Sequence, residues 1–390
     1  AILLCLTCCT QLHEQMRDFR VTGERHVYVP VSLHIGVGCG RLVVMQVGGV
    51  FERWEVLLGG RPLHQVRTAE MLAGPGETVA SPMVIKHVED DIVVGEAKAA
   101  PHEEYRAVER LHKPLPKPAP MPLLELRDTK QVRALKRFIP AIVFRQIEAG
   151  RDVFQLQEMR TLSMIWVHIS GLDIATRAPK RGVARVHVLM QKLQDAVYGN
   201  EGSVNRIFAD ESGQGLVLFC VFGLPPFVHQ DDPCRAVTSA KEMMTVIQRM
   251  GCTGKMGVTT GMVFCGVIGS ESRKEYTVVG DAVALAHVLV SEAGENSIFV
   301  DQTTHDLSKA SFEFISTKLG GGTGGGVGSR ISQHIFKPTV KLRQSQADRS
   351  PHSSQARLSD WDKWQQRESI AKTIEEAASR GGVLMLTGQV

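Results

Sequence analysis

The feature that most constrains the fold is an internal repeat. One stretch, Lys255–Val288, reads KMGVTTGMVFCGVIGSESRKEYTVVGDAVALAHV, and an earlier one, His34–Arg67, reads HIGVGCGRLVVMQVGGVFERWEVLLGGRPLHQVR. Aligned without a gap, the two share four glycines, namely Gly36 with Gly257, Gly40 with Gly261, Gly48 with Gly269 and Gly59 with Gly280. Short β-branched runs between glycines are typical of strands and their turns. The sequence therefore predicts one type of domain that occurs twice.

The composition is that of a soluble globular protein. The 390 residues are 43% hydrophobic and 22% charged, and their net charge is +4, which does not indicate a nucleic-acid partner. No apolar run reaches the ~18 residues that a membrane span requires. The eight cysteines are scattered, and several lie inside apolar runs, as buried thiols do in a reducing compartment. We expect a cytoplasmic protein of two to three domains without a membrane span.

A proline-rich segment separates the two copies. Residues 1–110 are interpreted as the C-terminal part of a first domain, which opens with a helix over residues 1–19. The sequence KPLPKPAPMP lies in a stiff linker over residues 111–138. Residues 139–340 form the second domain, whose predicted element order, β-α-β-β-α-β followed by a hairpin, indicates a ferredoxin-like α+β fold.

The remaining segments carry weaker patterns. Val79–Val88 and Ile92–Val94 are predicted as short strands. Residues 341–360 are polar and are interpreted as a linker. A helix and a strand are expected over residues 361–390, which is how a P-loop ATPase domain begins, although the motif's Lys and Ser/Thr are absent. The first residues, AILLCLTCC, have neither a Met nor a basic region, so we interpret the chain as a fragment.

Several motifs, in order, resemble the class III nucleotidyl cyclases. KMGVTTGMVFCGVIGSESRKEYTVVGDAV is similar to their central signature, WVHISGLD to their first-strand motif and NRIFADESG to their hairpin motif. The likeness is greatest to the soluble, bicarbonate-responsive adenylyl cyclases, in which an ATPase module follows two cyclase domains. The resemblance implies two ferredoxin-like cyclase domains, with antiparallel-rich sheets and helices packed on them. The first of these domains is expected to begin upstream of residue 1.

The resemblance also implies a chemistry. In this family the two domains pair with each other, and ATP in the cleft between them is converted to cyclic AMP and pyrophosphate with Mg²⁺ or Mn²⁺. Arg206 and Thr277 match the nucleotide-binding positions. Asp210 and His168 match metal positions, weakly, because the principal metal aspartates are expected upstream of residue 1. Hard carboxylate oxygens suit Mg²⁺, and a permanent cation suits phosphate.

The catalytic positions match the family unevenly. Ala284 and Val288 stand where the family has a transition-state Asn and Arg, and neither side chain can donate a hydrogen bond. In the ungapped alignment Arg67 of the first copy pairs with Val288, and the adjacent glycines Gly59 and Gly60 leave this register open by one residue. In the soluble cyclases an arginine of this kind lines a regulatory pocket, so Arg67 is expected to bind phosphate or bicarbonate.

The residues alone leave simpler interpretations open. Asp210 favours turns for local reasons, Thr277 favours strands by propensity, His168 fits a packed strand end and Arg67 fits a solvated cation. Two functions therefore remain. The first is an adenylyl cyclase in intracellular cyclic-nucleotide signalling. The second is a catalytically degenerate, cyclase-like regulatory or nucleotide-sensing module coupled to a downstream ATPase domain, which the residues at 284 and 288 favour.

Overall fold

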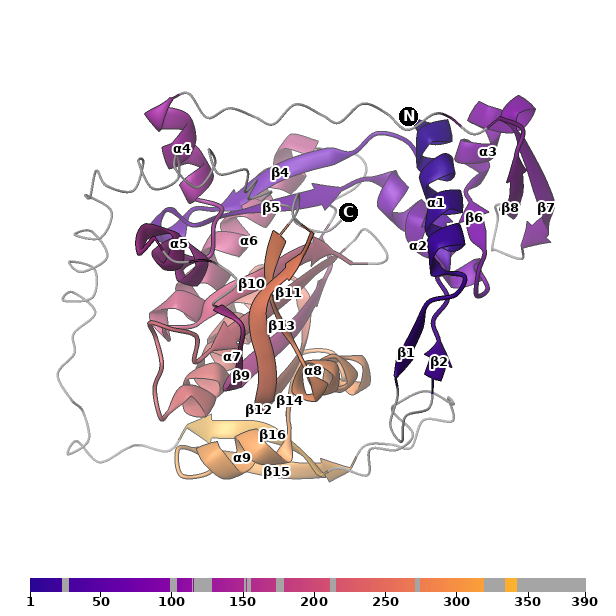
Figure 1. Ribbon diagram of the computed structural model, residues 1–390. Coiled ribbons are helices and arrows are strands. Elements are labelled where there is room, and N and C mark those ends of the chain that lie inside the picture. The colour runs from indigo at the N-terminus through magenta and orange to yellow at the C-terminus, as the bar shows by residue number, and fades with distance from the viewer. Residues whose placement is uncertain are drawn as a thin grey trace.

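The chain folds as an α+β protein with mixed sheets and helices (Figure 1). The computed structural model describes residues 1–22, 28–98, 104–113, 115, 128–150, 152, 156–172, 179–210, 215–270, 274–318 and 334–341. Most of the proline-rich segment and the elements expected over 361–390 lie outside the described residues. In the part of the chain that is described, no helix is long and apolar enough to cross a membrane.

The described residues of the first part of the chain form short strands, three α-helices and two 3-10 helices, which are labelled η. In order these are α1 (Ile2–Met16), β1 (Arg20–Thr22), β2 (Tyr28–Pro30), β3 (Ile35–Val37), β4 (Val43–Gly48), η2 (Val50–Glu52), β5 (Trp54–Gly59), α2 (Arg61–Leu72), β6 (Thr78–Ala80), α3 (Pro82–Val88), η3 (Glu89–Asp91), β7 (Ile92–Lys98) and β8 (Tyr105–Leu111). Strands β3, β6, β8 and β7 form one sheet in that order, whereas β4 pairs with β5 in a separate hairpin.

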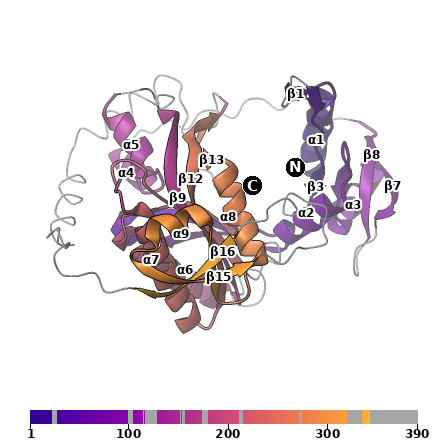
Figure 2. The same cartoon turned by 90° about the horizontal axis from the view of Figure 1, so that it is seen from below.

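The second part is built around a large mixed sheet. Its elements are α4 (Thr129–Lys136), α5 (Ala141–Glu148), β9 (Glu158–Ser170), α6 (Pro179–Gly199), β10 (Ser203–Ala209), β11 (Gly215–Phe222), α7 (Asp232–Arg249), β12 (Thr253–Gly269), β13 (Lys274–Val279), α8 (Asp281–Glu292), β14 (Ser297–Val300), α9 (Gln302–Ser308), β15 (Phe312–Lys318) and β16 (His334–Lys341). The strand order is β10-β11-β9-β12-β14-β16-β15, with β13 also paired to β12. Strands β15 and β16, with α9 beside them, form one end of this sheet (Figure 2).

The alternation of side chains along β9 explains how both faces of the sheet are covered. Ile165 and Val167 belong to the main core, which contains residues of α6 and α7. Met164, one position away, packs instead in a second cluster with Phe144 of α5. Trp166 lies edge-on to His287 of α8, with ring centroids 5.3 Å apart. Because successive strand residues point to opposite faces, the sheet is buried by α6 and α7 on one side and by α5 and α8 on the other.

The two stretches that share glycines fold into elements of the same kind and order. The similarity continues beyond the shared glycines, so from here the first stretch means residues 35–111 and the second stretch means residues 253–341. The first runs β3-β4-β5-α2-β6-α3-β7-β8, and the second runs β12-β13-α8-β14-α9-β15-β16. A Cβ atom on Gly36 would collide with the carbonyl oxygen of Val66 in α2, and one on Gly257 would collide with that of Ala286 in α8. Both glycines therefore permit the same close approach of a helix to a strand.

The helix starts fix the register between the two stretches. Gly60 is the N-cap of α2, and Gly280 is the N-cap of α8. Counted from these caps, Arg67 corresponds to His287. The ungapped pairing of Arg67 with Val288 is therefore wrong by one residue, because the first stretch has one more residue between its first strand and its helix than the second.

One predicted strand is mostly a helix. Val79–Val88 was expected to be a strand because of its valines, but only β6 is extended, and α3 begins at Pro82. The side chain of Ser81 accepts a hydrogen bond from the backbone N–H of Val84 at 3.4 Å. A serine cap followed by proline is a strong helix start, and here it outweighs the strand preference of valine.

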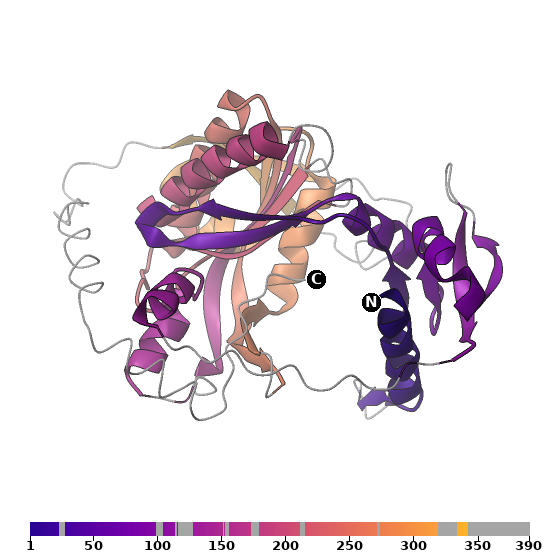
Figure 3. The same ribbon diagram turned by 90° about the horizontal axis from the view of Figure 1, so that it is seen from above.

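The hairpin β4–β5 reaches across to the second part of the chain, where it packs on α6 and β10 (Figure 3). Its buried residues Met45, Val47 and Leu57 belong to the main core. At the end of the hairpin the Trp54 ring stacks on His187 of α6, with centroids 5.6 Å apart. The first stretch therefore supplies part of the core under the large sheet.

Candidate functional site

The structure brings Arg206 and Thr277 together from two separate strands, β10 and β13. The Arg206 guanidinium donates a hydrogen bond from Nη2 to the Thr277 hydroxyl. Its Nε lies 3.4 Å from the carboxylate of Glu275, and the Thr277 side chain is fully buried. An arginine keeps its charge at all ordinary pH values. This arrangement therefore holds a permanent cation at a fixed position beside a buried hydroxyl.

Glu275 was missed in the sequence, although a usable signal existed. Glu275 and Thr277 are two residues apart on β13, so both face the same side of the strand. A carboxylate at this position can orient the guanidinium, which presents several N–H donors in one plane. The polar cluster is therefore Arg206, Glu275 and Thr277.

A second pair, His168 and Asp210, meets where β9 ends and the β10–β11 turn begins. His168 Nε2 lies 3.3 Å from Asp210 Oδ2. Asp210 Oδ1 accepts from the backbone N–H of Gly215 at 2.9 Å, and the Asp210 N–H donates to the Gly215 carbonyl at 3.0 Å. Asp210 therefore links the end of β10 to the start of β11, and both of its carboxylate oxygens are already engaged.

These residues do not fit a metal site by themselves. Across the described ranges, no group of three or more His, Cys, Asp or Glu side chains is arranged to hold a metal ion. The second carboxylate that a divalent-metal site would need beside Asp210 is replaced by His168. The assignment of Asp210 and His168 as metal ligands stays a prediction.

The remaining predicted residues lie on equivalent helices of the two stretches. Ala284 and Val288 are in the first two turns of α8, where Ala284 is exposed and Val288 is half-buried. Arg67 lies on α2, where its Nη1 is 2.8 Å from Glu70 Oε2 in an i,i+3 ion pair. The structure thus joins Arg206 with Thr277 and His168 with Asp210, and it places Arg67 on the helix that corresponds to α8.

Comparisons with known proteins identify the class. Residues 217–321, from β11 to the end of β15, match the family model described as "Adenylate and Guanylate cyclase catalytic domain". Adenylate cyclase type 10 of Oryctolagus cuniculus is 24% identical over 288 residues, which are 68% of this chain and 18% of that protein. The Homo sapiens protein of the same name is 27% identical over 161 residues, 41% of this chain and 10% of that protein.

Among solved structures, the adenylyl cyclase CyaB from P. aeruginosa is similar with a TM-score of 0.40 and 20% identity, over 48% of this chain and 97% of that one. The guanylyl cyclase Cya2 gives a TM-score of 0.40 and 22% identity, over 48% of this chain and 96% of that one.

Residues 217–321 of the chain therefore match the catalytic domain of the class III adenylyl/guanylyl cyclases. The chain is distantly homologous to the soluble adenylate cyclase type 10 and spans only about a fifth of the length of that relative.

Proposed function

We propose that this chain is part of a soluble, cytoplasmic adenylyl cyclase that converts ATP to cyclic AMP and pyrophosphate. The observation that carries the proposal is the contact between Arg206 and Thr277, since both match nucleotide-binding positions of the family and come from different strands. The relatives named adenylate cyclase type 10 support ATP as the substrate.

The polar cluster has the chemistry needed to bind an adenine edge. The edge of adenine offers an acceptor ring nitrogen beside an amino donor. Arg206 can only donate, whereas the Thr277 hydroxyl can accept. In this proposal Arg206 donates to the ring nitrogen and Thr277 accepts from the amino group. Glu275 holds the guanidinium in place through its 3.4 Å contact with Nε.

The two stretches are proposed to belong to two copies of one cyclase domain with a ferredoxin-like core. The copies are residues 1–110 and 139–340. Residues 111–138 and 341–360 are the proposed linkers, and residues 361–390 are the proposed start of a P-loop ATPase domain. Two observations support this pairing within one chain. The elements of the two stretches follow the same order, and the β4–β5 hairpin of one packs into the core of the other.

The proposed cofactor is Mg²⁺ or Mn²⁺, and the proposed regulator is bicarbonate; both follow from the family resemblance. A divalent ion would neutralise phosphate charge when bound, but both carboxylate oxygens of Asp210 are already engaged, by His168 and by the Gly215 N–H. Arg67 is the residue proposed to meet phosphate or bicarbonate, and Glu70 contacts its Nη1 at 2.8 Å.

A second candidate function is favoured by a specific observation. Ala284 and Val288 carry no polar side-chain atom at the positions where the family stabilises the transition state. Removing one such donor typically lowers the rate about 10²–10³-fold. A nucleotide-sensing module that binds ATP without turning it over is therefore the alternative.

The two candidates are separated by measuring ATP binding and cyclic AMP formation together, with Mn²⁺-ATP, with and without bicarbonate. The adenylyl cyclase proposal predicts slow cyclic AMP formation that rises in the double variant Ala284→Asn, Val288→Arg. ATP binding without cyclic AMP in either protein would support the sensor instead. If ATP does not bind to the parent protein at all, both candidates fail.

A further inference from the structure

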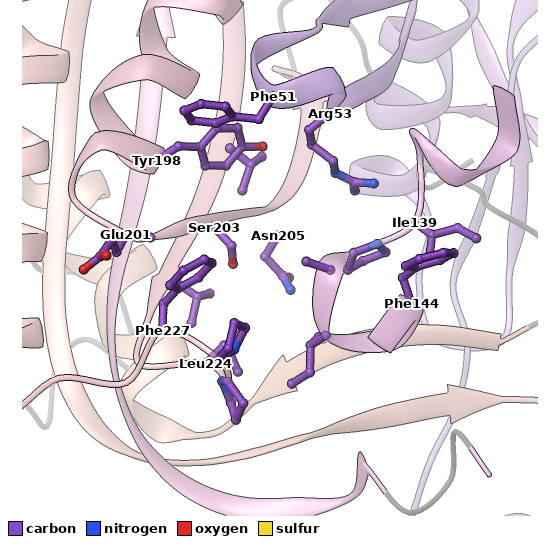
Figure 4. A pocket seen from close by; sticks show the side chains of 18 of the residues that line it. Phe51, Arg53, Ile139, Phe144, Tyr198, Glu201, Ser203, Asn205, Leu224 and Phe227 are labelled. Carbon is purple, nitrogen blue, oxygen red and sulfur yellow. The ribbon is translucent and has the colours of Figure 1, made fainter. Parts of the chain in front are cut away.

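A cavity of about 240 Å³ lies on the second part of the chain, where four segments meet (Figure 4). One wall is the tip of the β4–β5 hairpin at Phe51–Arg53, and another is formed by α4 and α5. The other two are the segment 198–205, from the end of α6 into β10, and the segment 224–227 after β11; Val221 of β11 and Tyr276 of β13 also line the cavity. Its volume is below the roughly 300–1,000 Å³ of drug-sized ligand sites, so it suits a compact molecule.

The lining of the cavity is mainly apolar and rich in aromatic rings. Figure 4 shows Phe51 and Tyr198 side by side at one end, where their ring centroids are 6.1 Å apart. Phe144 and Phe227 line other parts of it. Aromatic walls of this kind favour flat or ring-containing ligands, because ring–ring contacts add to the burial of apolar surface.

Two polar atoms in this lining have no hydrogen-bond partner within the described part of the chain. They are the hydroxyl oxygen of Tyr276 and Oδ1 of Asn205, and both atoms are buried. Only 7% of Tyr276 is exposed, and the Asn205 side chain points into the cavity (Figure 4). Burying a polar group without a partner is unfavourable. The cavity therefore presents one acceptor and one hydroxyl to whatever fills it.

Several charged groups at the rim are already engaged, and the Lys136 ammonium lies over the Phe144 ring, 4.5 Å from its centroid. Arg53 lies 3.1 Å from Glu55, and Glu201 contacts both His229 at 2.9 Å and Arg235 at 2.6 Å. A charged ligand would have to compete with these ion pairs. A neutral ligand avoids that competition and meets the two unpartnered polar atoms and the Ser203 side chain.

The cavity lies directly behind the candidate nucleotide residues. Asn205 precedes Arg206 on β10, at a register shift in its pairing with β11, and Tyr276 precedes Thr277 on β13. Bulges of this kind redirect a side chain relative to its neighbours. The same two strands therefore present Arg206 and Thr277 to each other and turn Asn205 and Tyr276 towards the cavity.

We propose that this cavity binds a compact, neutral, ring-containing molecule that carries a hydroxyl, such as an alkylated phenol. Its ring packs among Phe51, Tyr198 and Phe144. Its hydroxyl donates to Asn205 Oδ1 or accepts from the Tyr276 O–H, since a hydroxyl has both capacities. The site is separate from the polar cluster of Arg206, Glu275 and Thr277 and does not depend on whether the chain binds ATP.

The test is a ligand-observed NMR titration of the whole chain with 4-propylphenol and with 4-propyltoluene, in which a methyl group replaces the hydroxyl. We expect the phenol to bind and the toluene analogue to bind about five- to tenfold more weakly, as expected for the loss of a buried hydrogen bond. Absence of phenol binding, or equal affinity for the two molecules, would overturn the proposal, and the cavity would then hold water alone.

Two variants locate the binding. Tyr276→Phe keeps the cavity volume and should weaken phenol binding severalfold, whereas Tyr28→Phe, at a tyrosine that is 66% exposed on β2, should leave it unchanged. Ala141→Phe, from the first residue of α5, should fill the cavity and abolish binding. If Ala141→Phe does not fold, Tyr276→Phe still decides the matter, because phenol affinity unchanged by that substitution contradicts the proposal.

Discussion

The first and second stretches have the same element order, yet they use their hairpins differently. In the second stretch β12 is one long strand, and β9 pairs with it continuously from Thr253 to Cys265. In the first stretch the corresponding chain is divided into β3 and β4; β3 pairs with β6, and β4 pairs with β5. The long strand β9 therefore keeps the β12–β13 hairpin in line with the large sheet. The β4–β5 hairpin has no such partner in its own sheet among the described residues, and it packs on α6 and β10 of the second part.

One strand position shows what this difference means for the side chains. Counted from the N-cap glycines of α2 and α8, Leu57 on β5 corresponds to Thr277 on β13. Both are fully buried. Leu57 packs in the main core, whereas Thr277 accepts a hydrogen bond from Arg206. The same backbone position therefore serves packing in the first stretch and polar recognition in the second.

The largest effect is expected from truncating Leu57. Leu57→Ala should lower the free energy of unfolding by about 2–5 kcal/mol, because a buried leucine is replaced by a cavity. Chemical denaturation measures this change in the free energy of unfolding, with the unfolding of the second part of the chain as the observed signal. Leu42→Ala, at a leucine that is 48% exposed, is the control and should change stability by less than about 0.5 kcal/mol. A similarly small effect for Leu57→Ala would show that the hairpin does not stabilise the neighbouring core.

An intermediate effect is expected from the two glycines that lie beneath helices. Gly36→Ala and Gly257→Ala should each cost about 1–3 kcal/mol, since the new methyl group meets helix backbone that has to shift,. Thermal unfolding of both variants measures this. Gly199→Ala is the matched control, because a Cβ there meets nothing within 4 Å. If only one of the two strand glycines is sensitive, the two stretches do not pack their helices in the same way.

The smallest expected effect is a pH dependence of stability that arises at one of two equivalent helix caps, Ser81 of α3 and Asp301 of α9. Ser81 caps α3, and Asp301 caps α9 by accepting from the Thr304 N–H at 3.0 Å. Burial raises the pKa of Asp301 above its ordinary value. The folded state therefore favours the protonated acid, and this contribution to stability is present below the pKa of the unfolded chain, about 4, and is lost as pH rises through the folded pKa.

Asp301→Asn cannot titrate, so its stability relative to the parent should improve as pH rises from about 4 to 7. Urea unfolding at a series of pH values measures the difference. Ser81→Asn is the control in the first stretch and should show no such pH dependence. A stability difference for Asp301→Asn that is constant with pH would contradict the assigned role of burial.

Some of this structure could be predicted from the sequence, and particular residues show why. Periodic glycines and β-branched runs located β12 and β13, because these signals are local. The register of Arg67 could be predicted only to within one residue, because the adjacent glycines offer two possible helix starts; the structure places the N-cap of α2 at Gly60.

The contacts between distant segments could not be predicted. Arg206 and Thr277 were identified through the family resemblance. The two-residue spacing of Glu275 from Thr277 indicated a shared face of β13, but nothing in the sequence shows that β10 meets that face. The cavity behind them joins Phe51 to Phe144 and Tyr276, which are far apart in the chain. Such a site exists only once the tertiary structure has formed.

The most direct test of the account is calorimetric titration of ATP into the parent protein and into Thr277→Leu, which gives the second stretch the residue that the first one has. We predict that the parent binds ATP and that Thr277→Leu binds it at least about tenfold more weakly, because the buried hydroxyl that accepts from Arg206 Nη2 is lost,. Arg206→Leu should have an equal or larger effect. ATP binding of unchanged strength in both variants would contradict the claim that these two residues form the nucleotide site.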